Sequence, residues 1–250
     1  MKPRKPPKRV KLTIAYQGTQ YQGWQRQKRF KSIQGTLEKL LSNLLSEKIE
    51  LTASGRTDAG VHAKAQVASF VHHSSFPAGR LCYVLNYHLP DDIVITKAEE
   101  VLLDFHPRYS AKGKIYEYRI DNAPERDPQR AFQAWHVGEP LNVEAMRKAA
   151  AFWVGEHDFA SFRSQGSSAK STVRKIEVID IAHRGTEIIL TFKGNGFLYN
   201  MVRIMTAVLV MIGREKLTSD DARRLLEAKD RNLAPWTAPP QGLYLLEVIY

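Results

Sequence analysis

The chain has 250 residues, of which 43% are hydrophobic and 25% are charged, an ordinary balance for a globular protein in water. Its 37 lysines and arginines exceed its 26 acidic residues, and the formal net charge of +11 favours a polyanionic partner, although solubility or a membrane surface would also account for it. The single cysteine, Cys82, excludes an intramolecular disulfide and a cysteine-based zinc site.

The ends and the apolar runs of the chain predict no membrane attachment. Residues 1–9 are basic and rich in proline, and we expect them to form a disordered tail. No apolar stretch follows this tail, as a secretory signal would require. The longest apolar run, residues 201–212, is interrupted by Arg203 and is too short to span a bilayer. We therefore expect a cytoplasmic protein.

The first half of the chain has the periodicities of alternating strands and helices. Residues 10–16 alternate between apolar and polar side chains, which predicts a strand. Ser32 is placed to cap a helix whose leucines recur at helical spacing. The remaining segments predict two short strands, a helix and a strand, in the order β-α-β-β-α-β: residues 49–53, 66–71, 78–87 and 93–98.

The second half repeats this order. Asn142 is placed to cap a helix, and the turn at residues 184–186 predicts a hairpin. The predicted elements are residues 114–120 (strand), 142–154 (helix), 173–182 and 187–193 (strands), 199–212 and 219–228 (helices) and 243–250 (strand). We therefore predict an α+β fold of two ferredoxin-like βαββαβ halves, residues 10–109 and 110–250, after the tail at 1–9.

One loop carries the most informative residues. The run from Ser54 to Ala63 reads Ser-Gly-Arg-Thr-Asp-Ala-Gly-Val-His-Ala, and it leads into an alternating apolar stretch. Its only carboxylate, Asp58, lies between Gly55 and Gly60, which allow a sharp turn and close approach to a ligand. A loop that enters a strand is a usual place to display a reactive side chain. A solvated aspartate in a polar turn is the alternative for a generic glycine-rich loop.

This string closely resembles the Gly-Arg-Thr-Asp-Ala-Gly signature of the tRNA pseudouridine synthases of the TruA family. Other segments resemble the same family in the expected order and extend the similarity over nearly the whole chain: Tyr21–Gln27, Asn86–Ile93, Phe105–Ser110 and His157–Phe162. The resemblance implies mainly antiparallel sheets, joined side by side, with an active-site cleft between the two halves. It also implies that Asp58, the family's nucleophile, is catalytic.

Three further positions match the family's site. Tyr116 corresponds to the tyrosine that stacks on the target base, whereas Tyr118, on the same strand face, is interpreted as core. Arg203 corresponds to a basic position paired with the aspartate; a helical arginine that extends to solvent is the alternative. Leu243, after Ala-Pro-Pro-Gln-Gly, corresponds to an apolar wall under the base. Tyr199 stands where many relatives carry a basic residue.

The resemblance implies an isomerase that converts uridine to pseudouridine in the anticodon stem-loop of tRNA, at uridines 38, 39 and 40, as a homodimer. Asp58 would attack C1′ of the ribose or C6 of the base, or abstract the 2′ proton; the sequence leaves these alternatives open. Arg56 is placed to fill the gap left by the flipped base or to bind a phosphate. No cofactor and no metal are expected. The alternatives are a noncatalytic RNA-binding or RNA-chaperone protein and a structural ribonucleoprotein component.

Overall fold

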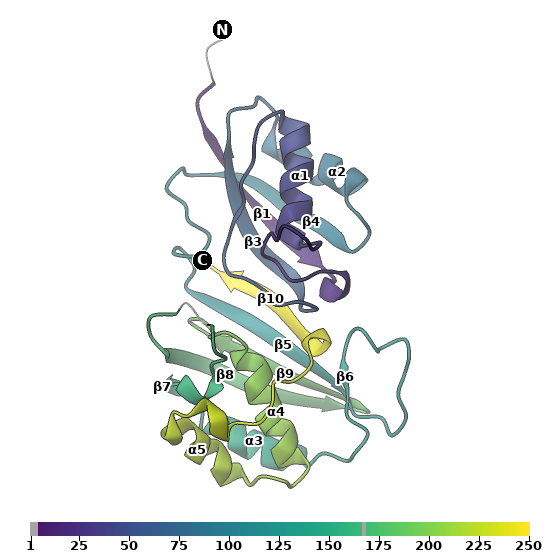
Figure 1. The fold of residues 1–250 in the computed structure, drawn as a ribbon, viewed down its shortest axis with the longest axis vertical. Helices are drawn as coiled ribbons and strands as arrows, with labels where there is room; N and C mark the ends of the chain where they lie inside the picture. Colours follow the sequence, from purple (N-terminus) through teal and green to yellow (C-terminus); the bar gives the residue numbers. More distant parts are fainter. Residues whose placement is uncertain (1–4, 167–168) are drawn as a thin grey trace. The chain divides into compact units, whose positions relative to one another are not determined.

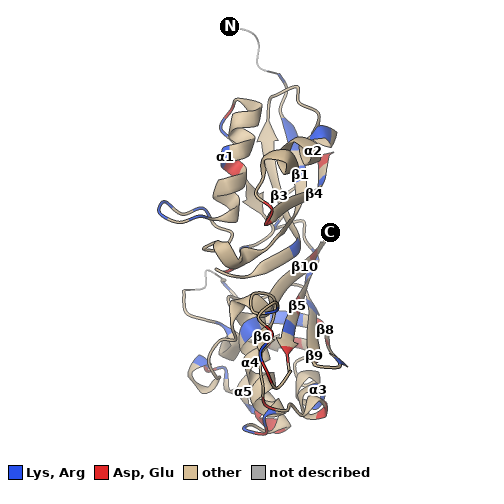
Figure 2. Ribbon diagram, turned by 90° about the vertical axis from the view of Figure 1, so that its right-hand side faces the viewer, with Lys and Arg blue, Asp and Glu red and all other residues tan. Residues whose placement is uncertain are grey.

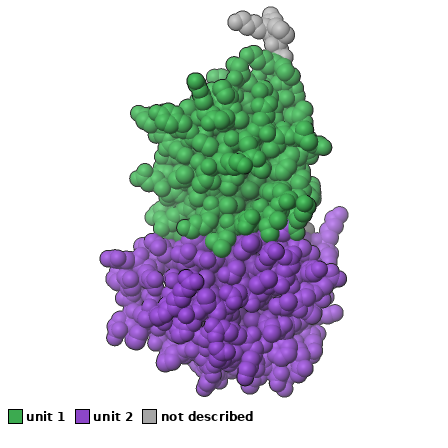
Figure 3. Space-filling view, turned by 180° about the vertical axis from the view of Figure 1, so that it is seen from behind, with its two compact units in different colours: residues 1–112, 245–250 green, residues 113–244 purple. Residues whose placement is uncertain are grey.

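The computed structural model describes residues 5–166 and 169–250, and the predicted α+β class is confirmed in them (Figure 1). This part of the chain contains five α-helices and a mainly antiparallel set of strands. The chain divides into two compact units, which Figure 3 shows in different colours. Unit 1 consists of residues 1–112 together with 245–250, and unit 2 of residues 113–244.

Unit 1 has the element order predicted for the first half of the chain. Its strands lie in the order β4-β1-β3-β10, with the short β2 paired to β3. The elements are β1 (Lys8–Tyr16), α1 (Ile33–Leu45), β2 (Thr52–Ala53), β3 (His62–His72), α2 (Ala78–His88), β4 (Ile93–Val101) and, from the end of the chain, β10 (Leu243–Ile249), with a short 3-10 helix η1 (Gly18–Gln20).

The core of unit 1 follows from the periodicities of its elements. Val10, Leu12 and Ile14 alternate along β1 and are fully buried, as are Leu37 and Leu41, one turn apart on α1. Helix α1 begins at the predicted cap, because the Ser32 hydroxyl accepts a hydrogen bond from the backbone N–H of Gly35 (3.3 Å).

The N-terminal tail is shorter than predicted where the structure describes it. Strand β1 begins at Lys8, so Lys8 and Arg9 belong to the sheet, in register with His72 and Val71 of β3. Residues 1–4 lie outside the described part of the chain, and so does the prediction that they are disordered.

The strands of unit 2 are mainly antiparallel and lie in the order β5-β9-β8-β7. The two-residue β6 pairs with β5 in parallel. The elements are β5 (Gly113–Asp121), β6 (Trp135–His136), α3 (Val143–Ala151), β7 (Gly155–Asp158), β8 (Val173–Arg184), β9 (Glu187–Gly194), α4 (Met201–Gly213) and α5 (Ser219–Ala228), and the 3-10 helices are η2 (Ala160–Phe162), η3 (Arg231–Leu233) and η4 (Pro240–Gly242).

Helix α4 is the centre of unit 2. Eleven of its thirteen residues are buried, and α3 and α5 pack against it. The predicted cap of α3 is confirmed, since Asn142 Oδ1 accepts the N–H of Ala145 (3.0 Å). In the described part of the chain, no helix is long and apolar enough to cross a membrane.

Candidate active site

The loop of residues 54–61, which we call the Asp58 loop, joins β2 to β3, as the sequence predicted. The buried amide of Gln66 fixes its first residues: Ser54 Oγ donates to Gln66 Oε1 (2.7 Å), and Gln66 Nε2 donates to the carbonyl of Gly55 (3.1 Å). The N–H of Ser54 also donates to the carbonyl of Val67 (2.8 Å). A buried polar group that is fully bonded in this way resists rearrangement, so the entry of the loop is rigid.

Thr57 anchors the middle of the Asp58 loop through both its backbone and its side chain. Its carbonyl accepts the N–H of Trp24 (3.0 Å), and its hydroxyl lies 2.7 Å from that of Tyr16. After Asp58 the chain turns back, with the N–H of Val61 donating to the carbonyl of Asp58 (3.1 Å). The Asp58 side chain is half-buried on this anchored backbone, whereas Arg56 is exposed.

Gly23 explains why the chain can pass so close to the Asp58 loop. Its φ is +84°, and a Cβ there would lie 2.6 Å from the Thr57 carbonyl oxygen and 3.0 Å from the carbonyl carbon of Asp58. Any other residue would therefore push on the backbone that presents Asp58. The N–H of Gly60 donates to the carbonyl of Tyr21 (3.3 Å). Residues 21–24 therefore bind the backbone on both sides of Asp58, at Thr57 and at Gly60.

In unit 2, Tyr116 lies on β5 opposite Phe192 of β9. Its ring packs edge-on against Phe197, with the ring centroids 5.1 Å apart and the planes at 82°. Phe197 belongs to the turn between β9 and α4, so the turn fixes the orientation of the tyrosine ring. Tyr118, on the same face of β5, is fully buried, as expected for a core residue.

Arg203 does not extend away from the protein. It is half-buried in the first turn of α4, where its Nε donates to the carbonyl of Ala238 (2.7 Å) and its Nη1 to Asn200 Oδ1 (2.9 Å). The N–H of Ala238 donates in turn to the carbonyl of Arg203 (3.3 Å). The arginine therefore joins the start of α4 to the proline-containing stretch before β10.

Leu243, the first residue of β10, is 6% exposed and follows the turn η4. Burial raises the pKa of the Tyr118 hydroxyl, which therefore stays protonated and donates to the carbonyl of Pro239 (2.7 Å). A Cβ on Gly242 would lie 2.6 Å from the Tyr118 ring, so this position requires glycine. The core tyrosine thus sets the path of the chain into Leu243.

The predicted site residues fall into two groups. Arg56 and Asp58 lie on one loop of unit 1, and Tyr116, Arg203 and Leu243 lie in unit 2. Arg203 and Leu243 come from segments that unit 2 joins through Ala238. The sequence analysis assigned no role to the residues that hold the Asp58 loop, which are Tyr16, Gly23, Thr57 and Gln66. Of these, Gly23 and Thr57 lie in segments that resemble the family.

The described residues contain no group of three or more His, Cys, Asp or Glu side chains that could hold a metal ion. A pocket of about 270 Å³ in unit 2 is lined by ten residues, among them Arg130, Trp135 and Asp121, the last residue of β5. None of the five predicted site residues lines this pocket, and we therefore place the candidate site on the Asp58 loop and its partners in sequence.

Comparison with known proteins identifies the family. The family model described as tRNA pseudouridine synthase matches residues 12–110 and 149–250. The chain is 45% identical over 241 residues to tRNA pseudouridine synthase A of Acetivibrio thermocellus, covering 96% of this chain and 99% of that protein. It is 45% identical over 244 residues to the protein of the same name from Ruminiclostridium cellulolyticum (97% and 100% covered) and 46% identical over 241 residues to that of Pelobacter propionicus (96% and 99%). The chain therefore belongs to the tRNA pseudouridine synthase family, a family of isomerases.

Proposed function

We propose that this protein converts uridine to pseudouridine in the anticodon stem-loop of tRNA, at uridines 38, 39 and 40, and that Asp58 is the nucleophile. The observation that carries the proposal is the identity of about 45% to tRNA pseudouridine synthase A proteins over nearly the whole chain. The family signature is intact around Asp58, on a loop whose backbone is bonded on both sides of the carboxylate.

The reaction is an isomerisation without net oxidation. The N1–C1′ bond breaks, the base turns, C5 bonds to C1′, and the proton of C5 leaves while N1 gains one. Asp58 supplies the nucleophile by attack on C1′ or on C6, or begins the reaction by abstracting the 2′ proton. A carboxylate in a protein that only bound RNA would repel the phosphate backbone, which favours catalysis over the RNA-chaperone alternative.

We assign the other site residues from the family resemblance and from their local contacts. Tyr116, whose ring is oriented by Phe197, stacks on the extruded base, and Leu243 forms the opposite apolar wall. Arg203, held by Asn200 and Ala238, pairs with Asp58. Arg56, exposed beside Asp58, contacts phosphate or fills the space that the base leaves. The protein acts as a cytoplasmic homodimer, without metal or cofactor.

The test is tritium release from tRNA labelled at C5 of uridine, under single-turnover conditions, with Asp58→Asn and Asp58→Ala. Both variants are expected to lose isomerisation and to keep tRNA binding, because the backbone hydrogen bonds of Thr57, Gly60 and Val61 that hold the loop can still form in each of them. Asp104→Asn, an exposed carboxylate of unit 1, serves as the control and is expected to match the wild type.

Substantial turnover by either Asp58 variant would refute the nucleophile, and a wild-type protein that binds tRNA without releasing tritium would support the RNA-binding alternative. Mapping pseudouridine in bulk tRNA from cells that lack this protein, with and without its return, tests which uridines it modifies.

A further inference from the structure

Residues 25–31, which we call the basic loop, form an exposed segment of unit 1 with an unusual composition. They read Gln-Arg-Gln-Lys-Arg-Phe-Lys, and every one of them is exposed. The loop precedes α1, and Figure 2 shows its cationic residues in blue. The aromatic ring among these cations, Phe30, is 59% exposed. An exposed aromatic ring flanked by cations combines the two features that bind single-stranded nucleic acid, a surface on which a base stacks and charges that contact the backbone.

The ends of the basic loop are closed by hydrogen bonds. The N–H of Gln22 donates to the carbonyl of Lys31 (3.0 Å), and Gln27 Nε2 donates to the carbonyl of Gln22 (3.1 Å). The ammonium group of Lys31 lies over the buried ring of Tyr21, 4.5 Å from its centroid. Because the loop is already closed, a ligand that binds to it does not have to offset the cost of ordering it.

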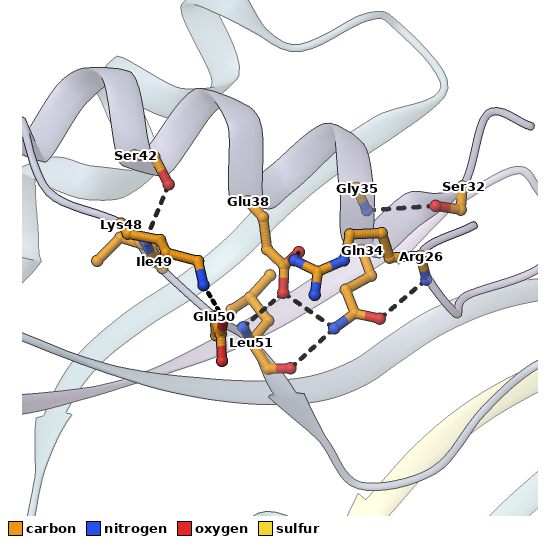
Figure 4. Close-up of polar contacts among 10 residues, drawn as sticks. All are labelled: Arg26, Ser32, Gln34, Gly35, Glu38, Ser42, Lys48, Ile49, Glu50 and Leu51. Carbon is orange, nitrogen blue, oxygen red and sulfur yellow. Dashed lines mark hydrogen bonds and ion pairs between the residues drawn. The ribbon is translucent and has the colours of Figure 1, made fainter. Parts of the chain in front are cut away.

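A buried carboxylate fastens the loop to α1 (Figure 4). Glu38, which is 4% exposed, accepts a hydrogen bond from Arg26 Nη1 (2.7 Å), and its other oxygen accepts from Gln34 Nε2 (2.9 Å) and from the N–H of Leu51 (2.8 Å). Gln34 Oε1 also accepts the N–H of Arg26 (2.9 Å). Leu51 begins the short run into the Asp58 loop, so one side chain links the two loops to the same helix.

Backbone hydrogen bonds join the segment just before the basic loop to the Asp58 loop. Trp24, immediately before the loop, bonds to the carbonyl of Thr57, and Tyr21 accepts the N–H of Gly60. These contacts are all within unit 1. When a chain molecule places a reacting group at Asp58, we therefore expect the units that follow this group to reach the basic loop.

We propose that the basic loop is a second RNA contact, in which Phe30 stacks on an unpaired base and Lys28 and Arg29 bind the phosphates that flank it. This inference rests on the proposed function for the identity of the ligand. RNA is the partner that uses both features, since an aromatic face binds any base and cations bind its backbone. An acidic protein would use the charge alone, and one exposed phenylalanine is too little apolar surface for stable attachment to a membrane.

The test compares tRNA affinity and single-turnover rate for Phe30→Ala, Phe30→Trp and the double variant Lys28→Gln/Arg29→Gln. Phe132→Ala is the matched control, because Phe132 is also 59% exposed but belongs to unit 2. Phe30→Ala is expected to weaken tRNA binding about tenfold, and Phe30→Trp to retain it, as base stacking requires. The double variant should reduce the slope of log affinity against log salt by about 1.4–1.8.

The rate at saturating enzyme is expected to stay at the wild-type value in all three variants, because none of them touches Asp58. If Phe30→Ala and the double variant bind tRNA like Phe132→Ala, the inference is wrong, whether or not the wild type makes pseudouridine. If Phe30→Ala instead changes the sedimentation of the protein without changing its affinity for tRNA, the loop is a protein contact. Wild-type binding without turnover would refute the proposed function separately.

Discussion

The hydroxyl groups of Tyr16 and Thr57 lie 2.7 Å apart in the interior of unit 1. Both residues are buried, at 5% and 6% exposure, and burial raises the pKa of the Tyr16 hydroxyl so that it stays protonated. Tyr16 ends β1, and Thr57 immediately precedes Asp58. One hydrogen bond therefore connects β1, which pairs with both β3 and β4, to the residue that precedes the proposed nucleophile.

Tyr16→Phe removes this bond and leaves the Thr57 hydroxyl buried without its partner. We expect the free energy of unfolding to fall by about 1–2 kcal/mol and the single-turnover rate to fall with it, while tRNA affinity is kept. Urea unfolding and tritium release measure the two effects. Tyr83→Phe, which removes a hydroxyl from a residue that is 79% exposed, is the control. A rate equal to that of the wild type would mean that the pair contributes only to stability.

The buried Glu38 is expected to stabilise unit 1 more than the exposed Glu50 does. Glu38→Ala leaves the Leu51 N–H without an acceptor and takes from the Gln34 amide one of its two acceptors, the other being the Leu51 carbonyl. We expect the free energy of unfolding to fall by about 3 kcal/mol. Glu38→Gln keeps an oxygen for Leu51 and should lose less. Glu50→Ala, which breaks an exposed ion pair with Lys48, should leave the urea midpoint near the wild-type value. Equal losses for Glu38→Ala and Glu50→Ala would contradict the role of burial.

Arg203→Ala should reduce turnover by more than it reduces tRNA binding. The change removes two donors that hold the carbonyl of Ala238 and the side chain of Asn200, and it removes the charge that we propose pairs with Asp58. Arg203→Lys should not restore the rate, because a single ammonium group cannot reproduce the planar two-nitrogen geometry. Arg223→Ala, on the exposed surface of α5, controls for the loss of charge. A restored rate in Arg203→Lys would show that the charge alone matters.

Activity should survive removal of metal ions. The chain has one cysteine, and the described residues hold no cluster of potential metal ligands. Protein dialysed against a chelator is expected to retain its full rate on tRNA that was folded beforehand, so that any effect of magnesium is traced to the RNA. Loss of the rate, with recovery only on addition of one transition metal, would contradict the prediction.

His72 should make the protein less stable in mild acid. Its ring is 1% exposed and packs against Phe70, and among the described residues its Nδ1 has no hydrogen-bond partner. Burial lowers its pKa below the usual 6.5, so below that pH the unfolded chain binds more protons than the folded one. The stability is complete above pH 6.5 and falls as the pH falls, by at most about 1.4 kcal/mol per pH unit.

The measurement for His72 is urea unfolding between pH 7.5 and pH 5 in the wild type, in His72→Gln and in His88→Gln, an exposed control. His72→Gln is expected to flatten the decline, and His88→Gln to keep it. Glu47, which faces His73, adds a separate effect at lower pH: despite the opposing effect of burial, its pKa is held below the usual value by hydrogen bonds from His73, so its contribution is lost only on stronger acidification. An unchanged slope in His72→Gln would refute the assignment.

The sequence predicted the features that depend on neighbouring residues. The caps at Ser32 and Asn142 are local hydrogen bonds, and the helices that follow them begin where they were expected. Helix α3, predicted to run to 154, ends at Ala151, because the backbone turns there and Gly155, with φ +117°, starts the unpredicted strand β7. The strand β6 has two residues, too few for any periodicity to be recognised.

In the candidate site, too, the local features were predicted and the contacts between distant residues were not. The glycines around Asp58 predicted an exposed reactive loop ahead of a strand, and the structure confirms the loop. The bond between Tyr16 and Thr57 joins residues 41 apart, and a sequence pattern contains no signal for a pairing over that distance. The contacts of Arg203 with Ala238, 35 residues away, are of the same kind.

The return of the chain to unit 1 has a consequence for how the protein is made. Residues 245–250 complete unit 1: the N–H of Lys112 donates to the carbonyl of Ile249 (2.8 Å), and the Tyr250 hydroxyl donates to the carbonyl of Pro107 (2.7 Å). All of residues 113–244 leave the ribosome before this strand does, which takes roughly 7 to 26 seconds at about 5–20 residues per second. During that interval the edge of β3 that pairs with β10 is open. Chaperones, or wrong strand partners, therefore have access to this edge while the rest of the chain is being made.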